Sequence, residues 1–368
     1  MTNQRYELDT RVLAVFFLAA MPFVALGSFL VVNMARSELL SSVGTSLDQR
    51  ALQTKVAVER YMADQVVHLR LLATDPQVVQ TLARQSSPDA EGLSARLRQI
   101  VGVRPALHAL QIVGARGLVV AATARTGPLD YASTTWWKAL SSQPEDRIEP
   151  WVGEIPRGAS ETSTVLEIAY PVRSAKGEWL GAVRGLVDGT DLYAVLAPVR
   201  VGHTGHAALV RSSDGLVVAA DDNERPLGQP LSGWGSLRSA IEGFPLAEHG
   251  QALFGKTEQR RGYWTIPAVA TKAENGREGL LEPARLVGFA PVDQVPNVKW
   301  LVTVEQDLNE ALAPVEGVTR YLWIHFVGVF ATVILLALWF SFKLETPVME
   351  EELHLHEEHV PQSMQTSA

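Results

Sequence analysis

Two apolar segments without any charged residue lie near the two ends of the chain, at 12–35 and 321–342. A helix of about 20 apolar residues spans the roughly 30 Å hydrocarbon core of a bilayer. Both segments are long enough, so we expect two transmembrane helices. The first segment could instead belong to a cleaved signal peptide, because small residues occur at 25–27. The apolar part of a signal peptide is usually only about 7–15 residues long, which favours an uncleaved anchor.

Between these segments, apolar residues are spaced first as in a helix and then as in strands. From 37 to 73 they recur mostly at steps of three or four, which predicts a long helix with one apolar face. That face could pack on the chain's own modules or pair with a second copy, because the heptad is not strict. Asp75 and Pro76 predict the start of another helix, since Asp caps helices and Pro fits their first turn.

The sequence Gly-Leu-Val-Val-Ala-Ala occurs twice, at 117–122 and 215–220. Each copy follows an apolar run and a polar turn, a pattern typical of a β-hairpin. A second pair of similar segments, 191–199 and 307–315, comes later in each half. Such repeats indicate repeated structural units, so we expect two similar sheet modules in tandem.

Shorter patterns predict the remaining elements. A Ser or Thr before Trp136 can cap a short helix that carries Trp136 and Trp137, and 85–90 has the composition of a loop. Strand-like runs occupy 148–155, 164–172 and 179–187 in the first module and 263–271, 285–291 and 298–305 in the second, which also has a helix near 231–241.

Composition excludes several functions. The formal net charge of −8 provides no basic surplus for binding nucleic acid. Without cysteine, the chain forms no disulfide, thiolate nucleophile or cysteine-ligated zinc site. Residues 354–359 include three His and two Glu, but their spacing is not the His-Glu-x-x-His pattern of zinc proteases, and we interpret them as a solvated tail. No hydrolase or phosphate-loop motif is visible, so we expect no catalytic residues, no metal, no cofactor and no enzyme.

The order of these features resembles the double Cache (dCache) sensor domain of bacterial chemoreceptors and sensor kinases. The resemblance covers 36–320 and both apolar segments. It rests on the long helix ending at Asp75-Pro76, the Tyr131…Trp136-Trp137 segment, the Tyr170-Pro171-Val172…Gly177…Gly181-Ala182-Val183 hairpin, the Gly205…Asp214-Gly215 start of the second module, and the strand Val298-Lys299-Trp300-Leu301-Val302.

The resemblance implies an α+β fold, in which a long N-terminal helix precedes two tandem PAS-like antiparallel-sheet modules flanked by two transmembrane helices. The implied boundaries are 1–11 for a cytoplasmic N-terminus, 12–35 for the first span, 36–104 for a helical stalk, 105–200 for a membrane-distal module, 201–306 for a membrane-proximal module, 307–320 for an exit helix, 321–342 for the second span and 343–368 for a cytoplasmic tail.

The resemblance also implies where a ligand binds. In this family the membrane-distal module, which comes first in the chain, usually holds the small-molecule pocket. Aromatic side chains of that module are therefore the expected ligand-binding residues: Tyr131, Trp136, Trp137, Trp151 and Tyr170. A cationic amine over the Trp rings is one candidate ligand, with Glu154 or Glu167 as its counter-charge. The alternative is that these Trp residues belong to an ordinary core.

Family members that bind amino acids carry an Arg two residues before the aromatic pair and Asp residues on later strands. Here Thr134 stands at the Arg position, and Gly153 and Leu186 stand near the acid positions. Neither half of the amino-acid clamp is present, so we do not expect a free amino acid held by a bidentate Arg.

These features predict a bacterial inner-membrane protein with two spans, cytoplasmic termini and a Cache domain in the periplasm or outside the cell. We expect it to bind a small extracytoplasmic ligand and to signal through a partner protein, because the 26 residues of 343–368 leave no room for an output domain. We also consider a homodimer. The alternative function is that of a ligand-free structural or interaction membrane protein that retains the Cache fold.

Overall fold

The structure is a computed structural model. It describes residues 10–84, 90–104, 106–124, 130–145, 148–155, 165–221, 227–243, 262–270 and 281–344. It contains one compact unit, Ser41–Ala311, and a second unit formed by the chain on either side of it. The loop expected at 85–90, apart from Ala90, and the tail histidines lie outside the described residues.

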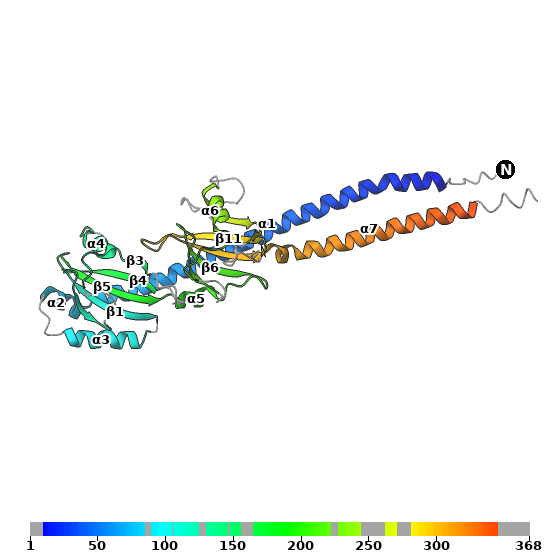
Figure 1. Ribbon diagram of the computed structural model, residues 1–368. Helices are drawn as coiled ribbons and strands as arrows, with labels where there is room; N and C mark the ends of the chain where they lie inside the picture. Colours follow the sequence, from blue (N-terminus) through cyan, green and yellow to red (C-terminus); the bar gives the residue numbers. More distant parts are fainter. Residues whose placement is uncertain are drawn as a thin grey trace, which may run out of the picture. The chain divides into compact units, whose positions relative to one another are not determined.

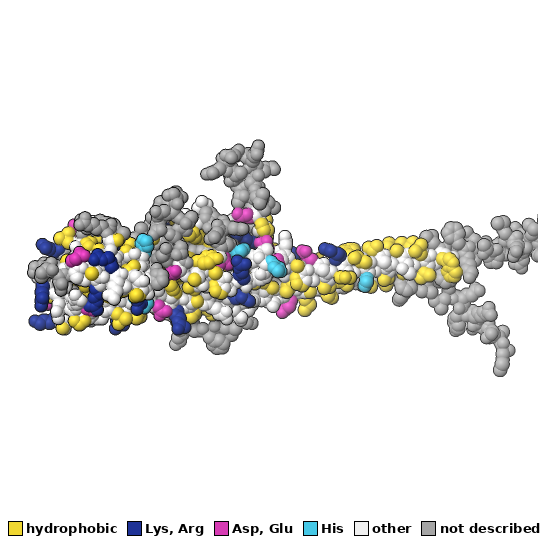
Figure 2. Space-filling view, turned by 90° about the horizontal axis from the view of Figure 1, so that it is seen from below, with side chains coloured by type: hydrophobic (Ala, Val, Ile, Leu, Met, Phe, Trp, Pro, Cys, Tyr) yellow, Lys and Arg dark blue, Asp and Glu magenta, His cyan; other side chains and the backbone are white. Residues whose placement is uncertain are grey.

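Two long helices contain the apolar segments: α1, Thr10–Ala73, and α7, Leu308–Leu344 (Figure 1). Both are long and apolar enough to cross a membrane, judged by length and composition. Large apolar side chains point outward from them, such as Phe29, which is 66% exposed, and Trp323, which is 62% exposed. Hydrophobic side chains dominate the surface of this helical part in Figure 2. Such a surface is stable in lipid and unfavourable in water.

The first module is a five-stranded antiparallel sheet with the strand order β2-β1-β5-β4-β3. Helix α4 lies on one face, in contact with β3, β4 and β5. Helix α1 lies on the other face, where Leu69 approaches Gly185 of β5. The elements are α2 (Pro76–Arg84), α3 (Ala90–Gly102), β1 (Leu107–Gly114), β2 (Val119–Ala122), α4 (Thr135–Ser141), β3 (Trp151–Ile155), β4 (Val165–Arg173), β5 (Trp179–Asp188) and α5 (Thr190–Leu196).

The second module repeats this order as β7-β6-β12-β11-β8. Its helix α6 packs on an apolar cluster of that sheet that includes Val210, Phe289 and Leu301. The predicted strand 263–271 is divided between β8 and β9. The elements are β6 (His206–Arg211), β7 (Val217–Ala220), α6 (Trp234–Gly243), β8 (Gly262–Ile266), β9 (Val269–Ala270), β10 (Leu281–Glu282), β11 (Arg285–Val292) and β12 (Trp300–Asp307).

The first hairpin of each module has the same strand register. In the first module Gln111 pairs with Ala122, and in the second Ala208 pairs with Ala220. Because Ala122 and Ala220 end the two copies of the six-residue repeat, Gln111 and Ala208 occupy equivalent positions. The structure thus confirms the two tandem modules and defines which of their residues correspond.

The turns within these hairpins also correspond. Gly117 and Gly215 have φ of 84° and 76°, a left-handed conformation that glycine adopts readily. Tyr131 and Leu231 each donate the backbone N–H to the carbonyl of the corresponding glycine at 2.8 Å. Tyr131 is therefore equivalent to Leu231.

The apolar face of α1 packs on the chain's own modules, the first of the two alternatives for this stripe. Where α1 crosses the second sheet, the approach is backbone to backbone, because a Cβ on Gly288 would lie 2.3 Å from the carbonyl carbon of Leu47. Five apolar residues of this face are at most 1% exposed: Leu47, Ala51, Val58, Met62 and Leu69.

Buried charges attach α1 to the turn between β11 and β12. The carboxylate of Glu59 accepts the backbone N–H groups of Asp293 and Gln294, both at 3.1 Å. Lys55 Nζ lies 2.7 Å from Asp293 Oδ1. Burial raises the pKa of Glu59. These contacts fix the tip of the hairpin against the helix.

Asp75 caps α2 as predicted. Its Oδ1 accepts the backbone N–H of Gln77 at 2.9 Å, which satisfies one of the free donors at the helix start. Its Oδ2 accepts a hydrogen bond from Arg96 at 2.6 Å, which links α2 to α3.

Candidate ligand site

Four of the predicted aromatic residues meet on the α4 face of the first sheet. The ring centroids of Tyr131 and Trp136 are 5.3 Å apart, and those of Trp136 and Trp137 are 5.6 Å apart, within the range of favourable ring pairs. These three side chains are buried, and Trp151 and Trp179 pack against the same cluster. The first module therefore has an aromatic wall.

A buried polar network adjoins this wall. Arg184 Nη1 and the Tyr131 hydroxyl both donate to Gln111 Oε1, each at 2.8 Å. Arg184 Nε also donates to Glu167 Oε1. The Arg184 guanidinium lies 4.9 Å from the centre of the Tyr131 ring, a cation–π distance. All four residues are at most 7% exposed.

The network is electrically balanced. Glu167 and Arg184 form one buried ion pair, so the site has no net formal charge. Burial raises the pKa of Tyr131, which keeps its hydroxyl protonated and able to donate at neutral pH. The first module therefore places fixed, mutually hydrogen-bonded polar groups beside an aromatic wall.

Strand register explains why these residues meet. Trp151, Ala169, Arg184 and Gln111 pair in sequence across β3, β4, β5 and β1. Paired residues of an antiparallel sheet point to the same face, and here that face carries α4. Glu167 lies two residues before Ala169 on the same face, which brings it diagonally next to Arg184.

Tyr170 is not part of this group. Neighbouring residues of a strand point to opposite faces, so Tyr170 faces away from Ala169 and away from α4. Burial raises its pKa, which the charge of Arg70 on α1 partly offsets. The structure thus places Tyr170 on the α1 side of the sheet.

Both proposed counter-charges already have cationic partners. Glu167 binds Arg184. Glu154 points away from the aromatic wall and binds Arg211 of the second module. An amine ligand over the Trp rings would compete with Arg184 for Glu167, whereas Glu154 lies on the other face of the sheet.

Thr134 stands at the N-cap position of α4 but does not cap it through its side chain. Its hydroxyl donates to the Tyr131 carbonyl at 2.7 Å instead. This contact closes the turn between the repeat hairpin and α4, and it positions the aromatic pair that follows.

The sequence interpretation missed Gln111 and Arg184. A signal was present, because Arg184 is a single charge inside an apolar strand, two residues from both Ala182 and Leu186. Its side chain therefore shares their face. Gly153 and Leu186 are the positions at which the acids of the family were expected. Both pair with Glu167, Gly153 from β3 and Leu186 from β5. The acidic residue among these three paired positions therefore comes from β4.

Two antiparallel five-stranded modules behind one long helix define the class of tandem PAS-like sensor domains. A family model of the double Cache type, described as "Cache domain", matches residues 32–315. That range is most of the 368 residues, and the chain belongs to the Cache domain family. The fold is a sensory, ligand-binding fold.

Solved structures of the same kind are similar to the chain at low identity. The ligand-binding domain of the Pseudomonas aeruginosa amino acid chemoreceptor PctC, in complex with GABA, is 20% identical, with a TM-score of 0.48 over 72% of this chain and 100% of that one. The corresponding domain of the Pseudomonas fluorescens chemoreceptor CtaA, in complex with L-serine, is 17% identical, with a TM-score of 0.45 over 72% and 97%. No curated protein matches the chain.

Proposed function

We propose that the chain is a bacterial inner-membrane sensory protein that binds a small extracytoplasmic ligand in its first, membrane-distal module. Membership of the Cache family supports the sensory role, and the two apolar helices support the membrane location. The ligand would lie against Tyr131, Trp136, Trp137 and Trp151, with the buried polar network as its recognition surface. The bound state would be signalled through a partner protein.

A comparison of the two modules carries this proposal. By strand register, Gln111, Glu167 and Arg184 are equivalent to Ala208, Val287 and Thr303 of the second module. Tyr131 is equivalent to Leu231. The second module thus folds without the polar network. It has its own buried pair, Arg285 with Glu305, but at other positions of the sheet.

The polar network is therefore not required by the fold. Replacing a buried ion pair by apolar residues is often neutral, or stabilising by about 1–4 kcal/mol. The first module keeps charged groups where the second has small or apolar ones. Recognition of a polar ligand provides a reason for that difference.

The proposed topology has both termini in the cytoplasm, spans at 12–35 and 321–342, and the region between them outside. The exit helix would transmit the signal, because β12 runs directly into α7. We propose no catalytic role, no cofactor and no bound metal. Association as a homodimer is compatible with this arrangement and stays a proposal.

The test is a ligand screen on the full chain in lipid nanodiscs, with the unfolding temperature followed by intrinsic fluorescence. A ligand at about a hundredfold excess over its dissociation constant adds about 2.7 kcal/mol of stability. Tyr131→Phe removes only one hydroxyl and should reduce the shift given by any hit. Tyr193→Phe on α5 makes the same chemical change at an exposed position outside the site, so it is the matched control and should retain the shift.

One observation favours the alternative of a ligand-free interaction protein. Trp136 and Trp137 are 3% and 5% exposed, as core residues are, and Glu167 and Arg184 already satisfy each other. If the chain is such an interaction protein, no compound of the screen should shift its unfolding temperature. A protein partner should then purify with the full chain from native membranes, with or without a substitution at Tyr131.

A further inference from the structure

A separate cleft of about 260 Å³ lies in the second module, between α6 and the sheet. Its volume is several times that of a water molecule, which occupies about 30 Å³ in the liquid. A small organic molecule fits in such a space. The residues around the cleft are Ser212, Trp234, Arg238, Ile241, Glu242, Pro291 and Leu301.

The cleft exists because different side chains cover the equivalent part of the sheet in the two modules. On the sheet, Pro291 pairs with Leu301 as Pro171 pairs with Ala182 in the first module. In the first module this part of the face belongs to the cluster that contains Trp136 and Trp137, with Trp179 packed against it. The described residues over the same surface of the second module leave it partly open.

The helices show why. Thr134 donates its backbone N–H to the Tyr131 carbonyl, and Trp234 donates its own to the Leu231 carbonyl. Thr134 and Trp234 therefore occupy equivalent positions at the entry to the helix, although α4 begins at Thr135 and α6 already at Trp234. Counting from there, Trp136 and Trp137 correspond to Ser236 and Leu237. Two indole rings are thus replaced by a hydroxymethyl and an isobutyl group.

Apolar and rigid groups form the walls of the cleft. Ile241, Pro291 and Leu301 are aliphatic, and the Trp234 ring lies directly on the turn at Gly215, where a Cβ would be 2.2 Å from the ring. The turn and the ring fix each other. A preformed aromatic surface of this kind binds a flat or branched apolar group without first having to be ordered.

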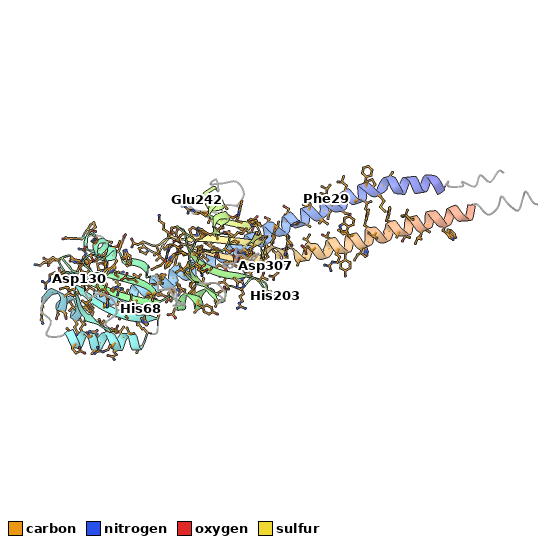
Figure 3. All side chains as sticks on the ribbon, in the orientation of Figure 1. Phe29, His68, Asp130, His203, Glu242 and Asp307 are labelled. Atoms are coloured by element: carbon orange, nitrogen blue, oxygen red, sulfur yellow. The ribbon has the colours of Figure 1, made fainter. Side chains whose placement is uncertain are left out.

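An ion pair lies at the rim. Arg238 Nε is 2.7 Å from Glu242 Oε1, and the two side chains are 51% and 60% exposed. Arg238 Nη1 also donates to the carbonyl of Ser213 at 3.2 Å, whereas Glu242 is bound by Arg238 alone among the described residues. Figure 3 labels Glu242 on α6. Exposed pairs contribute little to stability, so a ligand carboxylate can replace Glu242 while Arg238 stays in place.

We propose that this cleft binds a small hydrophobic carboxylate. The apolar body would lie against Trp234, and the carboxylate would take two hydrogen bonds from Arg238, the geometry that guanidinium and carboxylate favour. The buried pair in the first module cannot exchange in this way, because a displaced Glu167 would be left without its partner in a dry site. The two sites therefore differ in ligand class, and this proposal does not depend on the first site.

Phenylacetate is the probe, titrated by calorimetry into the full chain in nanodiscs, with empty nanodiscs as the blank. Phenylacetamide has the same shape without the charge, and phenethylamine has the opposite charge. We expect saturable phenylacetate binding that is about 10- to 100-fold tighter than that of the amide, the range of one charge-assisted hydrogen-bond site. Phenethylamine should not bind more tightly than the amide.

Two variants and one control locate the site. Arg238→Gln should reduce phenylacetate binding to the level of the amide, and Ile241→Trp should fill the cleft and abolish binding of both. Lys138→Gln is the matched control, because Lys138 holds the equivalent exposed position on α4, and it should change nothing. Circular dichroism checks the fold of each variant, and Arg238→Gln is an exposed substitution that keeps the test valid if Ile241→Trp misfolds.

Three results would overturn the proposal: no saturable binding of phenylacetate, equal binding of acid and amide, or binding that survives Arg238→Gln unchanged. Loss of phenylacetate binding in Arg184→Met with retention in Arg238→Gln would place the probe in the first module, and would also overturn it.

Discussion

Glu154 and Arg211 form a charge-assisted bridge between the two modules. The Glu154 carboxylate, on β3, accepts hydrogen bonds from Arg211 Nε at 3.0 Å and from Arg211 Nη2. It also accepts the indole N–H of Trp300, a fully buried residue that begins β12. The hydrogen bonds that Arg211 donates to Glu154 are the main cause of the raised pKa of Arg211. The edge strand of the first module is thus attached to the strand that leads into α7.

This bridge should be strongly coupled. Glu154→Leu leaves Arg211 and the Trp300 N–H without their shared acceptor. Breaking a fully buried ion pair lowers the free energy of unfolding by about 3–5 kcal/mol. We expect a smaller loss here, because Arg211 is partly exposed. In a double-mutant cycle with Arg211→Met, the coupling energy should be about 1–3 kcal/mol. Thermal unfolding of the four proteins measures it.

A matched control comes from an exposed pair. Glu91 and Arg98 are 88% and 50% exposed, so Glu91→Gln should change stability by less than about 1 kcal/mol. Additive effects of Glu154→Leu and Arg211→Met would show that the bridge does not couple the modules.

The buried pair of the first module should behave as one unit. Arg184→Met alone leaves Glu167 charged in a dry site, and Glu167→Leu alone does the same to Arg184. Each single substitution should destabilise the protein by about 3–5 kcal/mol, and the double substitution should recover most of that loss. Unfolding temperatures of the three variants decide this.

A ligand readout separates stability from recognition. If the network recognises the ligand, the stable double variant should give no thermal shift with a compound that stabilises the wild type. A full shift in that variant would show that the pair is only structural.

Glu310 should make stability depend on pH at the start of α7. Its carboxylate accepts the Thr204 hydroxyl, the Thr204 N–H at 2.9 Å and the His203 N–H at 2.7 Å. These bonds, that of the Thr204 hydroxyl first, lower its pKa from 4.5 to about 2. His203 lies near Asp307 at the end of the second module, as Figure 3 shows.

The sign follows from linkage. The unfolded chain binds the proton more readily, so this stabilisation is complete above pH 4.5 and disappears as the pH falls towards 2. Glu310→Gln should lower the unfolding temperature at pH 6, and the difference from wild type should shrink on acidification in non-ionic detergent. A difference that stays constant from pH 6 to pH 3 would contradict the assignment.

Two glycines should respond oppositely to alanine. At Gly288 a Cβ would collide with the backbone of α1 at Leu47, so Gly288→Ala should destabilise the protein by at least about 1–3 kcal/mol, the range for overpacked sites. Gly235 lies in α6 with nothing within 4 Å of its Cβ position, and Gly235→Ala should stabilise by about 0.4–1 kcal/mol. Unfolding temperatures of both variants check this. Equal effects would mean that α1 can move away from β11.

Local signals in the sequence were enough to predict much of the fold. The two copies of the repeat predicted two equivalent modules, because a turn that needs glycine and an alternating strand can be recognised from neighbouring residues alone. The Asp75 cap and the short helix with Trp136 and Trp137 were predicted for the same reason. Boundaries were less accurate, as for β3, which begins at Trp151 and not at 148.

The candidate site was only partly predictable. Trp136 and Trp137 belong to one sequence segment and were found together. Gln111 and Arg184 are 73 residues apart in the sequence and meet only because β1 pairs with β5. Tyr170 was predicted to bind ligand, but side chains alternate between the two faces of β4, and Tyr170 lies on the face opposite to the aromatic wall.

The sequence alone therefore determined the elements, the repeat and the two apolar helices, because these depend on short-range spacing. The tertiary structure decided which face of α1 is buried, which charges pair, and where a cleft remains open. Such features depend on which strands lie side by side and on whether the side chains of the described residues fill the space between helix and sheet. They fill it around Trp136 and Trp137 and leave a cleft beside Arg238 and Ile241.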